Sequence, residues 1–253
     1  MLMTQLKIQL DDRKKRILDA IVRDYLHTAE PVGSRTIWRA YMPDLSPATI
    51  RNEMADLEAM GFIVQPHTSA GRVPTDIGYR YYVDHLMKLR QLTAKEEEII
   101  NEGMKQIQSD VEEALHQTLK TLSSLVEYAS VIATLDNRTR VYSSGFSHML
   151  RQPEFSDMKY TRKVLETLEE DDLMAEMVKE YTTQKGITIR IGSENTFKEI
   201  KECSVVMSSY NIKNVTSGGM GVIGPTRMSY AKIASVLETL SSRLETFMDD
   251  KDE

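Results

Sequence analysis

The stretch from Pro43 to Arg72 constrains this chain most, because it combines a sharply delimited helix with a turn-rich loop. Ser46 is a preferred N-cap residue and Pro47 a preferred first helical residue, so together they predict where the helix begins. Gly61 is typical of the position just after a helix end. Between these limits apolar residues recur at helical spacing, as one stripe made of Ile50, Met54, Leu57 and Met60.

The residues after this helix predict a short strand and a polar loop. Phe62–Gln65 is a β-like run, and the loop from His67 to Arg72 is rich in turn residues. A helix followed by a hairpin with a polar tip is the outline of a winged helix, whose third helix fits the DNA major groove.

Two helices are predicted before this one. Residues 11–28 carry an apolar stripe, and residues 34–41 follow a break at Pro31-Val32-Gly33, with Ser34 as the expected N-cap. In the second helix, the residues expected to face inward are Ile37, Trp38 and Tyr41. Three helices and a hairpin in this order predict a winged helix-turn-helix domain.

A further helix is expected after the hairpin, from Pro74 to Leu89. Its tyrosines raise the possibility of base stacking, but their helical spacing favours packing on the domain core. We therefore expect Tyr79 and Tyr82 to be buried together with Val83 and Leu86.

Arg51 and Asn52 are the candidate base-reading residues. Arginine is the usual bidentate partner of guanine and asparagine of adenine, and both residues lie in the first turns of the third helix. The alternative is an ordinary solvated helix face, which any surface helix has. The wing that follows at once favours the DNA-reading interpretation.

Other polar residues of this region are expected to position the protein on DNA. Ser46 and Thr49 would position the third helix, and Ser34 and Arg35 would hold a phosphate where the second helix begins. The wing would contact the DNA backbone or the minor groove through His67, Thr68 and Arg72.

Residues 93–128 predict one long helix with an apolar seam. A seam of this length on a polar helix needs a partner. The periodicity leaves open whether that partner is a second copy of the chain or the C-terminal domain.

The remainder of the chain predicts a small α+β domain, because strands and helices alternate irregularly. Strands are expected on either side of a turn at Asp136-Asn137, and helices over residues 157–181 with a break at Glu169–Asp172. The later predicted elements are strands at Gly186–Ile191, Ser204–Tyr210 and Gly218–Gly224, and a closing helix from Met228 to Met248 that includes Phe247.

Composition and motifs exclude several function classes. The single cysteine, Cys203, excludes a disulfide framework and a Cys-rich metal site, and the five histidines are scattered. The glycines of Gly218–Gly224 lack the Lys-Ser/Thr of a phosphate-binding loop, so we expect them to serve turns and close packing, and Arg227 to be an ion-pair partner. We expect no catalytic site, no metal and no cofactor.

Charge and hydropathy indicate the setting. The net charge is −6, but residues 1–90 hold a slight excess of Lys and Arg, and the remainder carries the acidic surplus. This modest excess does not by itself establish nucleic-acid binding. No apolar run has the length of a bilayer span or of a signal peptide, so the expected location is the cytoplasm.

Several runs of the chain resemble the HrcA family of heat-shock transcription repressors. In the N-terminal part they are EPVGSRTI and SPATIRNEMADLEAMGFIVQPHTSAGRVPTDIGYRYYVD, and further on RQPEF, IRIGSEN, CSVV and GVIGPTRMSYAKI. The resemblance implies repression of chaperone operons through a dimer that binds an inverted-repeat operator of double-stranded DNA, the CIRCE element. It also implies a link to the GroE chaperonin, which maintains the DNA-binding form until heat diverts it.

The chain departs from the family pattern in the middle. The family combines a winged helix, a GAF-like domain and a dimerising domain inserted into it, but here only Ala129 to Arg140 bridge the gap before VYSSGFSHMLRQPEF. We expect some GAF-like strands and much of the inserted segment to be missing. This shifts the expected dimer seam to the helix at residues 93–128.

The predicted organisation is therefore α+β in three parts. A winged-helix DNA-binding domain spans residues 1–90, a long linker or dimerisation helix residues 91–128, and a reduced GAF-like α+β domain residues 129–253. The predicted function is a homodimeric, heat-released repressor. The alternative is a ligand-sensing winged-helix regulator whose GAF-like domain binds a small molecule.

Overall fold

The computed structural model describes residues 9–107, 110–136, 139–212 and 215–246. The predicted positions of Asn137, Phe247 and Met248 lie outside these residues. The chain forms two compact units, Met1–Met87 and Lys88–Glu253, and each is described by itself. No helix in the described ranges has the length and apolar character that crossing a bilayer requires.

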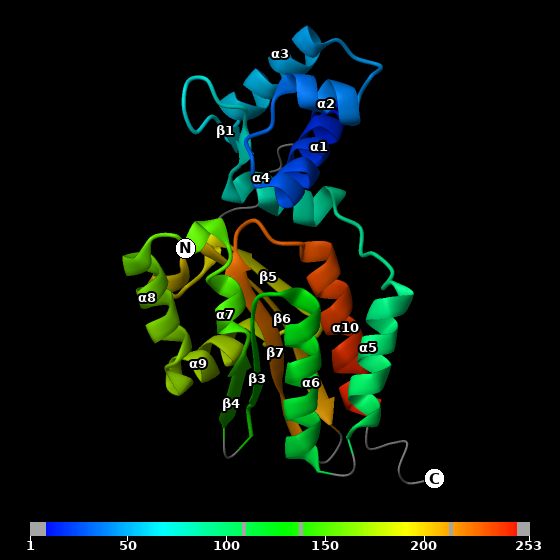
Figure 1. The fold of residues 1–253 in the computed structure, drawn as a ribbon, viewed down its shortest axis with the longest axis vertical. Helices are drawn as coiled ribbons and strands as arrows, with labels where there is room; N and C mark the ends of the chain where they lie inside the picture. Colours follow the sequence, from blue (N-terminus) through cyan, green and yellow to red (C-terminus); the bar gives the residue numbers. More distant parts are fainter. Residues whose placement is uncertain (1–8, 108–109, 137–138, 213–214, 247–253) are drawn as a thin grey trace. The chain divides into compact units, whose positions relative to one another are not determined.

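The first unit holds three helices, a two-stranded antiparallel hairpin and a closing helix (Figure 1). Val32, between the first two helices, forms an isolated antiparallel bridge with Arg72 and so adds a third short strand position to the hairpin. The order of elements is that predicted for a winged helix. The elements are α1 (Asp12–Thr28), α2 (Ser34–Ala40), α3 (Pro47–Ala59), β1 (Ile63–Val64), β2 (Val73–Pro74), α4 (Asp76–Tyr81) and the π-helical turn η1 (Tyr82–Leu86).

The core of the first unit confirms the buried tyrosines and corrects the second helix. Tyr79 and Tyr82 are 1% and 7% exposed, as their helical spacing predicts. Val83 and Leu86, which were expected to be buried with them, lie in η1 and are only half-buried. Only Ile37 of the three residues expected to face inward on α2 is buried, because Trp38 and Tyr41 are each 36% exposed. The short helix α2 buries only Ile37, and Tyr41 lies just beyond its end as the C-cap residue.

The second unit is built on one antiparallel sheet of five strands in the order β4-β3-β7-β6-β5. These are the five strands that the sequence predicts, and consecutive strands in the sheet are paired without interruption. Their bounds are β3 (Ala129–Thr134), β4 (Arg140–Ser144), β5 (Ile187–Ile191), β6 (Cys203–Ile212) and β7 (Thr216–Pro225).

Helices cover both faces of this sheet (Figure 1). On β6, the side chains of Ser204 and Ser208 point to α10, where they bond to Tyr230 and Ser241 at 2.7 and 3.2 Å. The helices of the unit are α5 (Ala94–Lys105), α6 (Val111–Val126), α7 (Phe146–Met149), α8 (Met158–Leu168), α9 (Asp171–Tyr181) and α10 (Tyr230–Thr246), with short 3-10 turns at Pro153–Phe155, Gly192–Glu194 and Lys198–Ile200.

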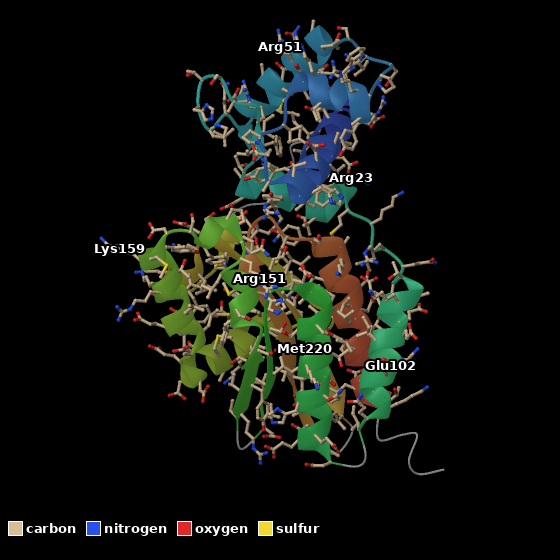
Figure 2. All side chains as sticks on the ribbon, viewed as in Figure 1. Arg23, Arg51, Glu102, Arg151, Lys159 and Met220 are labelled. Atoms are coloured by element: carbon tan, nitrogen blue, oxygen red, sulfur yellow. The ribbon has the colours of Figure 1, made fainter. Side chains whose placement is uncertain are left out.

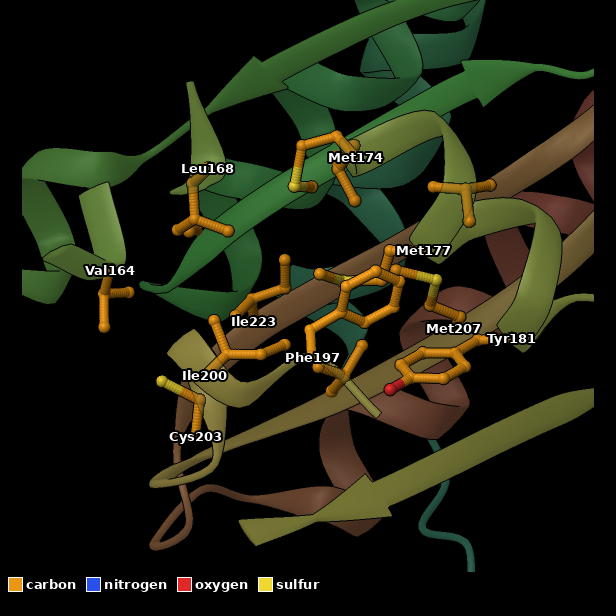
Figure 3. Packing of buried hydrophobic residues seen from close by; sticks show 14 of the residues in the cluster. Val164, Leu168, Met174, Met177, Tyr181, Phe197, Ile200, Cys203, Met207 and Ile223 are labelled. Atoms are coloured by element: carbon orange, nitrogen blue, oxygen red, sulfur yellow. The ribbon is translucent and has the colours of Figure 1, made fainter. Parts of the chain in front are cut away.

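The alternate residues of β6 point to the opposite face and form the main apolar cluster with α8 and α9. Val205 and Met207 are fully buried there, among side chains from both helices (Figure 3). Cys203 lies at the same cluster with its thiol 3.3 Å from the Tyr160 hydroxyl. Burial raises the pKa of this thiol to about 11.

The predicted long helix at residues 93–128 is wrong, because the chain breaks into α5 and α6. Asp110 caps α6 by accepting a hydrogen bond from the Glu112 amide at 3.2 Å, and Gly103 of α5 packs directly on Thr121 of α6. The two helices therefore fold against each other, and α6 also contacts α10 and the sheet. The apolar stripe keeps its helical spacing across the break, so the spacing alone predicts one continuous helix. Its partners lie in the same unit of the same chain, where α6 contacts α10, β3 and β4.

The glycines of β7 allow close packing, which is one of the two roles predicted for them. A side chain at Gly218 would collide with the carbonyl oxygen of Ala133 and with the Tyr210 ring, and one at Gly221 would lie 2.5 Å from Met207. None of them has a positive φ, so they make no turn. Arg227, just after β7, forms the predicted ion pair, at 2.8 Å to Glu154.

A buried amide ties the loop after β5 to the start of β6. The Nδ2 of Asn195, which is 2% exposed, donates to the carbonyl oxygens of Gly192, Ile200 and Cys203 at 3.0, 3.2 and 2.8 Å. Its Oδ1 accepts from the Tyr181 hydroxyl at 3.4 Å. One side chain thus connects three backbone carbonyls of the loop and the strand that follows it.

Asn195→Ala is expected to lower the free energy of unfolding by about 3 kcal/mol, because it leaves buried carbonyls without a donor. Chemical denaturation followed by circular dichroism measures this. The control is Asn211→Ala, at an exposed position of β6, which should change stability by less than about 0.5 kcal/mol. Equal effects of the two substitutions would contradict the structural role given to Asn195.

Candidate nucleic-acid interface

The third helix begins where the sequence predicts. The side chain of Ser46 accepts a hydrogen bond from the Thr49 amide at 3.0 Å, Pro47 is the first helical residue, and Gly61 takes a φ of +80° just beyond the end. The Ser46 hydroxyl also lies 2.9 Å from that of Thr49. This cap satisfies an amide that the helix leaves without a partner.

One face of α3 is buried and the other carries the candidate base readers. Ile50, Met54 and Leu57 are at most 4% exposed, whereas Arg51 and Asn52 are exposed. Figure 2 shows Arg51 at the outer surface of α3. Within the described ranges neither side chain has a hydrogen bond or ion pair. Met60, expected in the buried stripe, is 42% exposed because the helix has already ended at Ala59.

Ion pairs join the middle of α3 to α1. Glu53 accepts from Lys14 at 2.7 Å and from Arg13 at 3.1 Å, and Lys14 also reaches Asp56 at 3.2 Å. The hydrogen bond that Lys14 donates to Glu53, ahead of those to Asp11 and Asp56, raises the pKa of Lys14. Glu53 follows Asn52 in sequence, so this cluster holds the backbone that presents both base-reading candidates.

The hairpin loop places His67 and Thr68 at an exposed tip, as predicted. Arg72 does not share that exposure. Its guanidinium is directed at Glu58 of α3, with Nη2 2.8 Å and Nε 2.9 Å from the same carboxylate oxygen, and its side chain is 19% exposed. The structure therefore assigns the guanidinium of Arg72 an intramolecular partner.

The start of the second helix differs from the prediction. The N-cap residue of α2 is Gly33, with no side-chain hydrogen bond, and Ser34 is the first helical residue. Ser34 is half-buried and Arg35 is exposed. Gly33 takes the extended cap conformation, so the helix starts one residue earlier than a Ser34 cap would allow, and the Ser34 hydroxyl does not cap the helix amides.

Sequence reasoning missed Glu58 and Gln65, which organise the wing. They are seven residues apart and lie on different elements, so no helical or strand periodicity connects them. The one local signal is Glu58 itself. A carboxylate in the last turn of a helix lies at the negative end of the helix dipole and needs a compensating partner.

Among the residues that the structure describes, no three His, Cys, Asp or Glu side chains come together as metal ligands. The exposed arginines of α2 and α3, Arg35, Arg39 and Arg51, are donors of the kind that bind phosphate oxygens.

Comparisons with known proteins agree on one family. Residues 79–234 match the family model described as HrcA protein C terminal domain. The heat-inducible transcription repressor HrcA of Pelotomaculum thermopropionicum is 33% identical, over 96% of this chain and 98% of its own length. The protein of the same name from Desulforamulus reducens is 32% identical, with the same coverage of both chains.

These alignments also show that the chain is short for its relatives. The first extends over 340 positions, whereas the chain has 253 residues, so at least 87 positions (340 − 253) have no counterpart here. A solved structure, a crystal structure of a hypothetical protein, matches with a TM-score of 0.76 at 22% identity, covering 95% of this chain and 98% of that one. At that identity the match shows a shared fold.

Ser46→Ala is expected to lower the free energy of unfolding of the first unit by about 1 kcal/mol, because the Thr49 amide loses its acceptor. Ser46→Asp should keep the wild-type value, since aspartate is an equally good cap. Trp38 is the only tryptophan and lies in this unit, so its fluorescence during denaturation reports the change. Indistinguishable stabilities for the Ala and Asp variants would show that the cap contributes nothing.

Proposed function

The chain belongs to the HrcA family of heat-inducible transcription repressors, and we propose that it represses by laying α3 of its first unit into the major groove of operator DNA. The observation that carries this proposal is the exposure of Arg51 and Asn52 on a capped helix whose opposite face is buried. A helix of this kind fits the major groove, and the residues of its first turns reach base edges.

Arg51 and Asn52 have the chemistry for direct readout. The guanidinium matches the O6 and N7 acceptors of guanine, and the amide matches the N6 donor and N7 acceptor of adenine. Neither side chain has to leave an intramolecular partner among the described residues in order to bind. Ser46 and Thr49 hold the N-terminus of α3, where the free amides favour a phosphate.

The distribution of unpaired arginines in the first unit also supports α3 as part of the DNA-binding face. Most of its arginines are paired with carboxylates, as in the pairs Arg16–Asp44 and Arg23–Asp19. Within the described ranges, exposed arginines without an ion pair are Arg35, Arg39 and Arg51, on α2 and α3. Arg35, next to Ser34, is proposed to contact a phosphate, and His67 and Thr68 to contact the backbone or the minor groove.

Two copies of the first unit, one from each chain of a homodimer, are proposed to bind an inverted repeat of the CIRCE type together, since a two-fold dimer matches a palindromic site. The predicted seam on residues 93–128 is already occupied within the chain, so the dimer has to form through another surface. We propose that the protein acts in the cytoplasm, without enzymatic chemistry, and that the GroE chaperonin maintains its binding form.

The ligand-sensing alternative has less support. The space between the sheet and α8–α9 is filled with apolar side chains (Figure 3). Met174, Met177 and Tyr181 from α9 are at most 1% exposed there. Heat release therefore remains the better proposal for how repression ends.

Arg51→Ala is expected to weaken operator binding by about 1–3 kcal/mol and to relax specificity at one base pair, because a bidentate base contact is lost. A gel-shift titration on an inverted repeat, with variants at each position, measures both effects. The matched control is Arg23→Ala, an exposed arginine of α1 that is paired with Asp19. Wild-type affinity and specificity for the Arg51 variant would count against α3 as the reading helix.

Operator binding is also expected to be lost in the heat-shock range and restored by added GroE chaperonin. Fluorescence anisotropy of labelled operator DNA, read as temperature rises, measures the loss. Trp38 emission shows in the same sample whether the first unit is still folded. Unaided binding that persists through that range in folded protein would remove the temperature response from the proposal.

A further inference from the structure

One carboxylate of α3 serves two separate points of the wing. The Oε1 of Glu58 accepts a hydrogen bond from the Gln65 amide at 3.1 Å, just after β1. Its Oε2 accepts from Nε and Nη2 of Arg72 at 2.9 and 2.8 Å, just before β2. The two strands of the hairpin are thus joined to the helix through one side chain.

The side chain of Gln65 continues this set of contacts into the loop. Its Nε2 donates to the carbonyl oxygens of Thr68 and Ala70 at 3.0 and 2.9 Å. The Ala70 amide in turn bonds to the carbonyl oxygen of His67 at 2.9 Å. The tip that carries His67 and Thr68 is therefore closed by an amide from its own base.

The base of the wing is fixed on its other side by the backbone. Val32 and Arg72 exchange two N–H···O bonds of 2.9 Å. Gly71 packs so closely on this bridge that a Cβ would lie 2.5 Å from the Val32 carbonyl carbon and oxygen. Arg72 is held by its backbone to the segment before α2 and by its side chain to α3.

We propose that Glu58, Gln65 and Arg72 are positioning residues that set the wing tip in register with Arg51 and Asn52, so that helix and wing meet DNA as one rigid surface. This rests on the proposed function, because it assumes that α3 and the tip both contact DNA. The physical gain is preorganisation. A loop already ordered in the free protein loses less conformational freedom on binding.

We refer to Glu58, Gln65 and Arg72 together as the clamp. The attraction between the Glu58 carboxylate and the Arg72 guanidinium contributes to holding it in place. Glu58 and Arg72 are 32% and 19% exposed, so solvent screens their attraction less than that of a fully exposed pair. The carboxylate stands at the unfavourable end of the α3 dipole, which the guanidinium offsets. The clamp therefore contains Arg72, the cation that was predicted from the sequence to contact DNA.

A double-mutant cycle between Glu58 and His67 tests the clamp, with operator affinity as the readout. His67→Ala should weaken binding of the wild-type protein about tenfold, equivalent to 1.4 kcal/mol. In a Glu58→Ala background the same substitution should cost about twofold or less, because an unclamped tip no longer makes its contact, and contacting residues in one network are not additive. Glu58→Gln keeps an acceptor for the Gln65 amide and loses the ion pair, so it should give an intermediate coupling.

Asp84→Ala is the matched control. It removes the 3.0 Å ion pair with Arg80, in the same unit and outside the wing, and should be additive with His67→Ala. Trp38 fluorescence establishes that each variant is folded under the assay conditions. A merely structural role for Glu58 would lower stability without changing the cost of His67→Ala, so the coupling separates the two roles.

Three outcomes would overturn the proposal. One is full additivity of Glu58→Ala and His67→Ala; another is no effect of His67→Ala in the wild type. The third is tighter binding with a steeper salt dependence in Glu58→Ala, which would mean that Glu58 withholds Arg72 from a phosphate. Arg51→Ala, run in parallel, distinguishes the levels of failure. If it weakens binding while the cycle is additive, only the clamp fails; if it has no effect, α3 is not the reading helix.

Discussion

The burial of one face of α3 is the constraint on which the DNA-reading surface depends. Ile50, Met54 and Leu57 fix the rotation of the helix about its axis, because turning any of them outward would expose apolar surface. The side chains of Arg51 and Asn52 then have to point away from the core. Their outward orientation follows from the 3.6-residue period and from the position of their apolar neighbours.

Charged groups add what apolar burial leaves undetermined. Burial is non-directional and permits small slides of α3 along α1, whereas the Glu53–Lys14 and Glu58–Arg72 pairs require particular atoms to meet. Glu53 lies at the middle of α3 and Glu58 near its end. The recognition helix is thereby held at two points, by residues that lie between its buried and its exposed face.

Local patterns predicted most of the fold and the exposed half of the interface. Caps, stripes and turn residues act over four or five positions, so the start of α3, its end at Gly61 and all five strands could be read directly. The apolar stripes of α5 and α6 keep the same helical spacing through Asp110, so periodicity could not predict the break between the two helices. The ion pair of Arg72 could not be predicted, because its partner Glu58 is fourteen residues away on another element. Pairings of that kind depend on tertiary geometry, which no local rule contains.

The burial of Cys203 makes the molecule convenient for site-directed spectroscopy. It is the only thiol of the chain, it is fully buried beside Tyr160, and its raised pKa keeps it in the protonated, unreactive form at neutral pH. A cysteine introduced at an exposed position would therefore be the one accessible nucleophile for maleimide dyes or spin labels. Distances between two labelled copies could then be measured on the native background, with no cysteine to remove first.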